Sequence, residues 1–172
     1  QNYFQNNQIL KKIINISKSV NFKGLSIDTR TLKKENLFLA IKGKINDGNN
    51  FIKDALKKGA GCALSSFNSK KNKKIIKIKN TISFLNNFAK LKREHSYAKI
   101  ISITGSTGKT SLKNLIKDLL PHFGKTHYSP KSFNNHFGVP ISLSNLSYED
   151  KFGVFEVGMS KPGEIRNLTK LI

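Results

Sequence analysis

One stretch of the sequence, KIISITGSTGKTSLKNL over residues 99–115, constrains the fold more than any other. It joins a run of β-branched apolar residues to a glycine turn and then to a helical pattern, which predicts a strand, a tight loop and a helix. Backbone N–H groups and a helix N-terminus then meet at one point, which attracts anions. The strict G-x-x-x-x-G-K-[ST] pattern would have glycine in place of Ile103. We predict a nucleotide-binding loop, with an ordinary glycine turn before a basic helix as the alternative; its residues are Gly105, Ser106, Thr107, Gly108, Lys109, Thr110 and Ser111.

Three residues give this loop a predicted chemistry. Lys109 can reach the β- and γ-phosphates of a nucleotide, and the Thr110 hydroxyl can hold Mg²⁺. The apolar run FGVFEV, residues 152–157, predicts a second strand with an acid, Glu156, near its end. A carboxylate in that position can share the Mg²⁺ that the loop hydroxyl holds. We therefore predict Thr110 and Glu156 as metal ligands, with an ordinary exposed glutamate before the turn at Gly158 as the alternative.

The net charge of +21 would ordinarily indicate nucleic acid or an anionic membrane surface as a partner. Of the 31 basic residues, however, only Arg30, Arg93 and Arg166 are arginine, whereas phosphate and base recognition favours the forked donors of arginine. The excess lysine accompanies abundant Asn, Ile and Phe, so it indicates solvated lysine faces. We predict no nucleic-acid partner, and a basic P-loop protein that binds nucleic acid remains the rival of a different class.

The remaining bulk features predict a cytoplasmic protein without a membrane span, and we expect a monomer. No apolar run approaches the roughly 20 residues of a membrane helix, and no secretory signal opens the chain. The single cysteine, Cys62, allows no intramolecular disulfide, and its surroundings, GCALSS, favour a small buried strand residue over a nucleophile. The chain begins with Gln and stops inside a helix-like pattern, NLTKLI, so we expect that both ends are cut.

Hydrophobic patterning predicts an α/β fold: a small N-terminal α/β substrate domain, residues 1–80, and the first part of a P-loop-type parallel-sheet ATPase domain, residues 81–172. In the first domain we expect strands over residues 25–29, 37–41, 62–64 and 75–78, and helices over 5–16 and 51–56, the latter closed by Gly59. In the second we expect a helix over residues 82–91, strands at 125–129 and 152–157, a loop at 132–140, and a last helix from Pro162. The apolar residues after the phosphate loop are expected to pack against the sheet; they are Leu112, Leu115, Ile116, Leu119 and Leu120.

Four runs of the sequence resemble the Mur ligases, ATP-dependent amide-forming enzymes of bacterial cell-wall precursor synthesis. They are SIDTRTLKKENLFLAIKG with DGNNFIKDALKKGA behind it (residues 26–43 and 47–60), ITGSTGKTSLK (103–113), SFNNHFGVP (132–140) and FEVGMSKPGEIRNLT (155–169). The phosphate loop is shared by all Mur ligases and by folylpolyglutamate synthases. The resemblance covers nearly the whole chain but only part of the family's length, and implies that more of the ATPase domain and a C-terminal domain would follow.

The resemblance implies an ATP- and Mg²⁺-dependent ligase of peptidoglycan synthesis. The FNNxxGVP and GEI runs favour the member that adds D-alanyl-D-alanine to UDP-N-acetylmuramoyl-tripeptide through an acyl phosphate, so these two molecules are the implied partners. A sister ligase that adds the third amino acid is the alternative within the family, and a catalytically silent, truncated binding protein is a further rival. We expect no ligase activity from the fragment alone, because a metal-ligating His, a modified Lys and the adenine pocket usually lie downstream.

The resemblance also implies site residues. The loop Ser26, Asp28, Thr29 and Arg30 matches the family's contact with the uridine nucleotide. Lys109, Asn134 and Asn135 form the implied catalytic set, the two asparagines lying near the reacting phosphoryl and carboxylate groups. Asn49 stands where family members often carry His. His136, a lone loop histidine without a partner acid nearby, is left out of the set.

Overall fold

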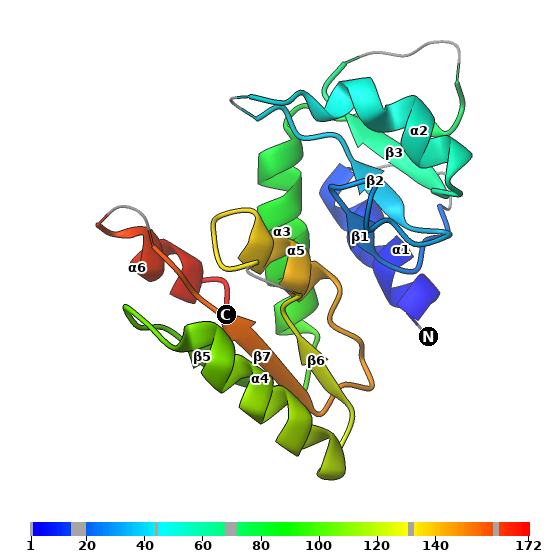
Figure 1. The fold of residues 1–172 in the computed structure, drawn as a ribbon. Coiled ribbons are helices and arrows are strands. Elements are labelled where there is room, and N and C mark those ends of the chain that lie inside the picture. Colours follow the sequence, from blue (N-terminus) through cyan, green and yellow to red (C-terminus); the bar gives the residue numbers. More distant parts are fainter. Residues whose placement is uncertain (1, 15–19, 44, 68–71, 131–132, 160–161) are drawn as a thin grey trace. The chain divides into compact units, whose positions relative to one another are not determined.

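The computed structural model describes residues 2–14, 20–43, 45–67, 72–130, 133–159 and 162–172 (Figure 1). Residues 15–16 of the first expected helix, and residues 132 and 160–161 of the quoted runs, lie outside this description. The chain forms two compact units, residues 1–88 and 89–172. The division falls within α3 (Thr81–Glu94), whereas patterning placed the boundary after residue 80. Each unit combines helices with a parallel sheet, so the predicted α/β class is confirmed.

Residues 1–88 contain a parallel sheet in sequence order, β1-β2-β3-β4. Its strands are β1 (Leu25–Ser26), β2 (Leu37–Leu39), β3 (Cys62–Ser65) and β4 (Ile75–Lys77), and β1, β2 and β4 are shorter than patterning predicted. The helical elements are α1 (Asn2–Ile14), the 3-10 turn η1 (Gly48–Phe51) and α2 (Ile52–Lys57). Because each strand pairs with the next one in the sequence, the connections between them pass as crossovers over the sheet.

Short apolar side chains fill the core beside α2. Ala55 of the helix and Ala63 of β3 are fully buried beside Phe38 of β2. Gly59, the residue after the C-cap Lys58, has a positive φ of 93° and closes the helix as the sequence predicted. Cys62 is buried in β3, and burial raises the pKa of its thiol to about 12. The interpretation of this cysteine as a buried strand residue is therefore confirmed.

Residues 89–172 contain a parallel sheet with the order β5-β7-β6. Its strands are β5 (Lys99–Ile103), β6 (Thr126–Tyr128) and β7 (Phe152–Glu156). The last strand in sequence, β7, lies between the other two, and its Glu156 pairs with Ile103 at the end of β5. Carboxyl ends of parallel strands meet at one edge, so this register brings Glu156 beside the loop that follows β5.

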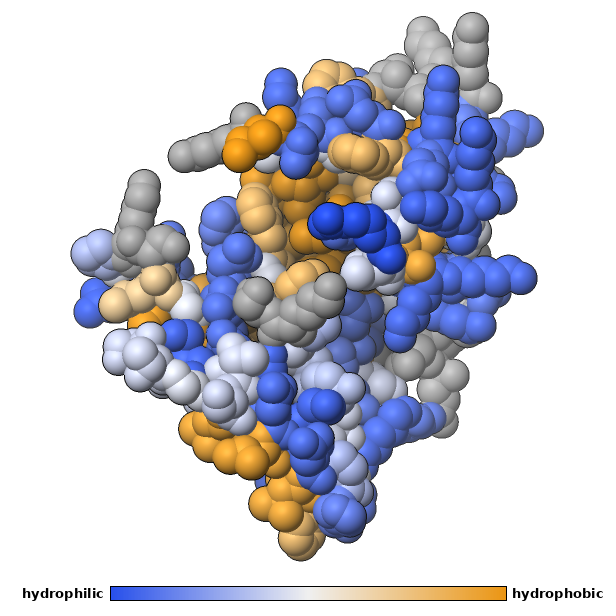
Figure 2. Space-filling view, in the orientation of Figure 1, coloured by the Kyte–Doolittle hydropathy of each residue, from blue (hydrophilic) through white to orange (hydrophobic). Residues whose placement is uncertain are grey.

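Helix α4 (Lys109–Leu119) contacts β7 and β5 and is followed by the 3-10 turn η2 (Leu120–His122). The predicted packing face of α4 is wrong. Leu112, Leu115 and Leu119 are exposed, Leu115 at 69%, and apolar surface lies over α4 in Figure 2. The buried residue of the helix is Lys113, and the apolar residues three and seven positions further on, Ile116 and Leu120 at the start of η2, are half-buried. Since residues at this spacing share a helix face, placing Lys113 toward β7 turns the leucine stripe away from it.

Helix α5 (Gly138–Ser144) was not predicted, because residues 132–140 were expected to form a loop. All seven of its residues are buried, so the run shows no alternation between an apolar and a polar face. It contacts β7, and its Val139 and Leu143 join a core that includes Phe155 of the strand. Helix α6 (Glu164–Thr169) adds Leu168 to the same core. None of the described helices is both long and apolar enough to cross a lipid bilayer.

Candidate functional site

The phosphate loop joins β5 to α4 in the form that the sequence predicted. Gly105 and Gly108 have positive φ values of 151° and 75°, which residues other than glycine rarely adopt. Gly108 directly precedes α4, so the turn leads straight into the helix N-terminus. The Lys109 ammonium folds back over the loop and donates to the carbonyl oxygens of Gly105 and Ser106, at 2.6 and 3.4 Å. Loop amides, helix N-terminus and ammonium therefore converge on one exposed turn.

Glu156 is the centre of a polar cluster beside this loop. The Thr110 hydroxyl donates to Glu156 Oε2 at 2.8 Å, and the Asn134 amide donates to Oε1, also at 2.8 Å. The Lys113 ammonium lies 3.5 Å from Oε2, and both charged side chains are 2% exposed. The backbone N–H of Glu156 donates to Ser129 Oγ at 3.1 Å, which fixes the strand end. The alternative of an ordinary exposed glutamate is therefore wrong.

This environment keeps Glu156 charged. Burial alone would raise its pKa, but the hydrogen bonds from Asn134 and Thr110 and the adjacent Lys113 ammonium outweigh burial, and the pKa lies below its ordinary value. Each of these partners favours the carboxylate over the neutral acid. The cluster therefore holds a negative charge next to the phosphate loop.

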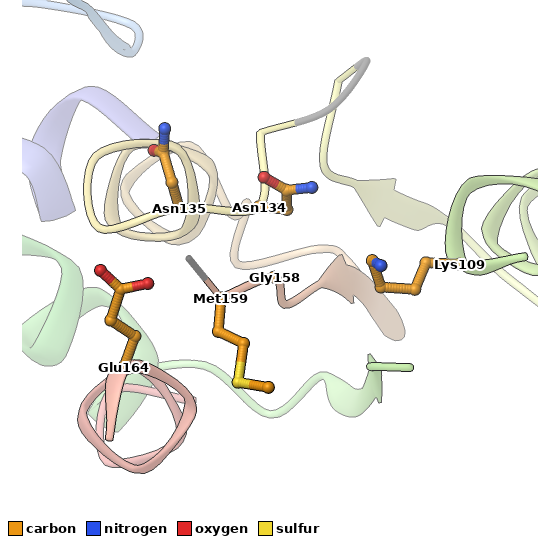
Figure 3. Close-up of a pocket in the computed structure, with 6 residues that line it drawn as sticks. All are labelled: Lys109, Asn134, Asn135, Gly158, Met159 and Glu164. Carbon is orange, nitrogen blue, oxygen red and sulfur yellow. The ribbon is translucent and has the colours of Figure 1, made fainter. Parts of the chain in front are cut away.

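A pocket of about 200 Å³ opens between the phosphate loop and α6. Figure 3 shows Lys109 reaching from the start of α4 toward the Asn134 side chain, and Glu164 rising from α6 on the other side. Gly158 and Met159, which follow β7, line its floor. A Cβ added at Gly158 would approach the Asn134 side chain to 3.0 Å. The Gly158 N–H donates to the backbone carbonyl oxygen of Asn134 at 2.8 Å. The chain after β7 therefore holds Asn134 against Glu156.

The two predicted metal ligands suit a hard divalent cation. Thr110 Oγ1 and Glu156 Oε2 are oxygens 2.8 Å apart at the loop, and Mg²⁺ prefers one or two such protein oxygens together with phosphate oxygens of a substrate. Within the part of the chain that the structure describes, no three His, Cys, Asp or Glu side chains come together as a separate metal cluster. The residues present therefore fit a nucleotide-bound Mg²⁺ better than a metal held by protein alone.

Asn135 and His136 have different contacts from Asn134. Asn135 Oδ1 accepts from the backbone N–H groups of Phe137 and Gly138 at 3.1 and 2.9 Å, so this side chain closes the start of α5 while it lines the pocket. His136 is exposed and lies against the Phe137 ring, with 4.0 Å between ring centroids. We therefore distinguish Asn134, which contacts the acid, from Asn135, which orders the helix behind it.

The predicted uridine loop lies in residues 1–88, at the end of β1. Ser26 Oγ donates to the Asp28 carbonyl oxygen at 2.9 Å and accepts from the Asp28 N–H. The Arg30 guanidinium donates to both Asp28 carboxylate oxygens, with Nη2 2.7 Å from Oδ2, and this pairing raises the pKa of the guanidinium. Arg30 is nevertheless 86% exposed, and Lys58 Nζ donates to the Thr29 carbonyl oxygen. The loop is thus ordered by its own side chains.

The structure brings together Lys109, Thr110, Asn134 and Glu156, and places Ser106 and Thr107 on the exposed loop. Sequence reasoning missed Lys113, Met159 and Glu164 as neighbours of the site. The signal for Lys113 was its spacing, since a residue three positions after Thr110 on a helix lies on the same face. Met159 and Glu164 lie in the run FEVGMSKPGEIRNLT, whose family resemblance marked this segment without singling out these two side chains.

Comparison with known proteins accounts for most of the chain. Residues 21–101 match the Mur ligase family catalytic domain, and residues 103–172 match the Mur ligase middle domain. A protein named UDP-N-acetylmuramoyl-tripeptide--D-alanyl-D-alanine ligase from Rickettsia prowazekii is 39% identical over 161 residues, which cover 92% of this chain and 36% of the relative. A protein of the same name from Buchnera aphidicola is 41% identical over 139 residues, covering 81% and 30%.

Solved structures of ligases also match this chain. A ligase from Acinetobacter baumannii, titled UDP-N-acetylmuramoylalanyl-D-glutamyl-2,6-diaminopimelate--D-alanyl-D-alanyl ligase, matches with a TM-score of 0.80 and 26% identity, covering 98% of this chain and 39% of that one. MurF ligase from Thermotoga maritima, in complex with ADP, matches with a TM-score of 0.70 and 27% identity over 90% and 36%. The chain thus spans about a third of the length of these proteins. Two adjoining Mur ligase domains and a shared fold lead to one conclusion: the chain belongs to the Mur ligase family.

Proposed function

We propose that this chain is the substrate-binding and phosphate-binding part of a ligase that uses ATP to join D-alanyl-D-alanine to UDP-N-acetylmuramoyl-tripeptide. The observation that carries the proposal is the buried Glu156 held by Thr110 and Asn134 beside the phosphate loop. The relatives named for this reaction support the choice of substrates. The cytoplasmic location and the monomeric state predicted from the sequence belong to the same proposal.

The reaction requires an activated acid. A carboxylate does not react with an amine at neutral pH, because oxide would have to leave. In the proposed reaction the terminal carboxylate of the tripeptide attacks the γ-phosphorus of ATP, the bond from that phosphorus to the bridging oxygen breaks, and ADP leaves with the electron pair. The amine of D-alanyl-D-alanine then displaces phosphate from the acyl phosphate and loses a proton. The first step brings two anions together, so positive charge and positioning are its main needs.

The residues of the loop, of the Glu156 cluster and of the neighbouring pocket would meet those needs in distinct ways. The loop amides and the N-terminus of α4 would bind the phosphates, and Lys109 would exchange its bonds to the Gly105 and Ser106 carbonyls for bonds to phosphate oxygens. Thr110 and Glu156 would hold Mg²⁺, which supplies charge neutralisation to the phosphates when it is bound. Asn134, fixed by Glu156 on one side and by Gly158 on the other, would present its remaining amide atoms to the pocket.

The N-terminal unit would bind the uridine end of the substrate. Asp28 already holds the Arg30 guanidinium in a fork-to-carboxylate pair, so Arg30 is presented in one orientation at the end of β1. An exposed, oriented guanidinium next to backbone and hydroxyl donors suits a polar base or a diphosphate. Ser26 and Thr29 would complete this contact.

The substrate assignment can be tested in a chimera in which this chain replaces the matching part of the Rickettsia relative. We expect ADP and phosphate to form only when UDP-N-acetylmuramoyl-tripeptide and D-alanyl-D-alanine are both present. The intact relative is the positive control for the assay. ATP turnover that is equally fast without D-alanyl-D-alanine would contradict the proposal. Turnover on the dipeptide precursor with diaminopimelate or lysine would instead identify the sister ligase.

The phosphate loop can be tested in the same chimera by Lys109→Ala. We expect a loss of at least about a hundredfold in turnover, because the residue would stabilise charge in the transition state. Lys170→Ala, which removes an exposed lysine from the end of α6, is the matched control and should retain full turnover. Near-normal turnover in a folded Lys109→Ala chimera would remove the loop from the mechanism.

A further inference from the structure

Lys113 is a buried cation for which the proposed mechanism has no use. It lies on α4 between Lys109 and Lys117, is 2% exposed, and places its ammonium 3.5 Å from Glu156 Oε2. The same carboxylate oxygen accepts from Thr110 at 2.8 Å, so the ammonium lies beside one of the two oxygens that would bind the metal. A lysine is rarely buried this far without a paired charge, and Glu156 supplies that charge.

The charges around these oxygens do not favour a free cation. Glu156 contributes one negative charge and Lys113 cancels it, while Lys109 and the N-terminus of α4 add positive potential from the loop. The acid that lines the neighbouring pocket is Glu164, which comes from α6 and lies across the pocket from Lys109. A nucleotide triphosphate would reverse this balance, because it brings several negative charges to the loop.

We propose that Lys113 is a positioning residue that closes the Thr110–Glu156 pair to free divalent cations, so that Mg²⁺ enters only together with the nucleotide. This inference rests on the proposed function for the identity of the site. While no nucleotide is bound, the Lys113 ammonium supplies the positive charge that the metal would otherwise supply to Glu156. It keeps Glu156 charged and oriented toward Thr110. When the phosphates arrive, their charge offsets the ammonium and the same two oxygens accept the cation.

The test is a titration of the nucleotide-free chain with Mn²⁺, in which electron paramagnetic resonance measures free Mn²⁺. Lys113→Gln replaces the cation with a neutral amide that can still donate to Glu156, and we expect it to bind Mn²⁺ at least tenfold more tightly than the wild type. Lys117→Gln removes a charge one turn further along α4, where the ammonium lies over the Tyr128 ring, and should leave the affinity unchanged. Lys113→Arg, which keeps the charge, should remain closed, and Lys113→Gln with Glu156→Gln should lose the added binding.

The result that overturns the inference is equal Mn²⁺ affinity in Lys113→Gln and the wild type, because Lys113 would then be a structural counter-ion only. If Lys113→Gln does not fold, as judged by circular dichroism, the wild type decides. Binding of Mn²⁺ without nucleotide that is as tight as binding with ADP, and that Glu156→Gln abolishes, would also overturn it. The Mn²⁺ titrations do not depend on the amide-forming reaction. If the chimera used an acceptor other than D-alanyl-D-alanine, the proposed reaction would be refuted and the inference about Lys113 would stand.

Discussion

Among the described residues of 89–172, the fold buries Lys92 as well as Lys113. The Lys92 side chain is 2% exposed, and burial lowers its pKa to about 8, against the opposing influence of Asp150. In the unfolded chain the pKa is close to 10.5. Between these values the unfolded chain binds more protons than the folded one, so stability rises with pH through this window. We expect Lys92 to add on the order of 3 kcal/mol to the free energy of unfolding between pH 8 and pH 10.5.

Urea unfolding near both ends of this pH range measures the effect. Lys92→Met should remove the rise, since methionine carries no proton to titrate. Lys90→Met is the matched control on the same helix, because Lys90 is 63% exposed and pairs with Glu94, and it should retain the wild-type rise. An identical pH dependence in the wild type and in Lys92→Met would show that the buried amine is not the source.

At the residue scale, the sequence predicted contacts where chain geometry alone decides them. A strand that ends in an acid beside a strand that ends in a phosphate loop must bring Glu156 to Thr110, and the two side chains are hydrogen-bonded. Lys113 could not be singled out in the same way, because a lysine-rich sequence does not show which ammonium is buried. The two asparagines looked equivalent in sequence, yet Asn134 bonds the acid and Asn135 the start of α5.

At the scale of elements, the loss of a leucine should destabilise the protein much more in α5 than in α4. Leu143 of α5 is fully buried in the core beside β7, so Leu143→Ala should cost roughly 2–5 kcal/mol of unfolding free energy. Leu115 of α4 projects into solvent, and Leu115→Ala should change stability by less than about 0.5 kcal/mol. Denaturant titration of both variants gives the comparison. A large loss in Leu115→Ala would mean that the leucine stripe packs against the chain.

The errors at this scale have one physical origin. Periodicity reports which face of a helix is apolar, but the fold decides which face is covered, and on α4 the covered side chain is Lys113 beside Glu156 while three leucines are exposed. Helix α5 was missed for a related reason: all of its residues are buried, so it lacks the alternation of apolar and polar residues that periodicity detects. Strands were located more reliably, because short apolar runs bounded by polar or glycine-containing turns leave few alternatives.

At the scale of the whole molecule, the α/β class followed from alternating strands and helices. The structure divides the chain after residue 88, inside α3, and patterning placed the boundary after residue 80. Thr81–Glu94 reads as one helix with one apolar face, so the sequence offered no reason to place a boundary inside it. Phe88 packs against the rings of Phe22 and Phe84 in the first unit, whereas Ala89 belongs to the core of the second. A helix that serves two cores shows no break in its pattern.

Two cores in one chain predict two separable responses to core mutations. Phe38 is fully buried beside α2 in the first unit, and Phe155 is fully buried beside α5 in the second. Truncation of either to alanine removes about 3–5 kcal/mol from the core that holds it. Hydrogen exchange followed by mass spectrometry should therefore show lost protection mainly in residues 20–88 for Phe38→Ala, and mainly in residues 89–172 for Phe155→Ala. Equal loss across both units in both variants would mean that the chain unfolds as a single cooperative body, because a core that is stable by itself keeps its amides protected when its neighbour opens.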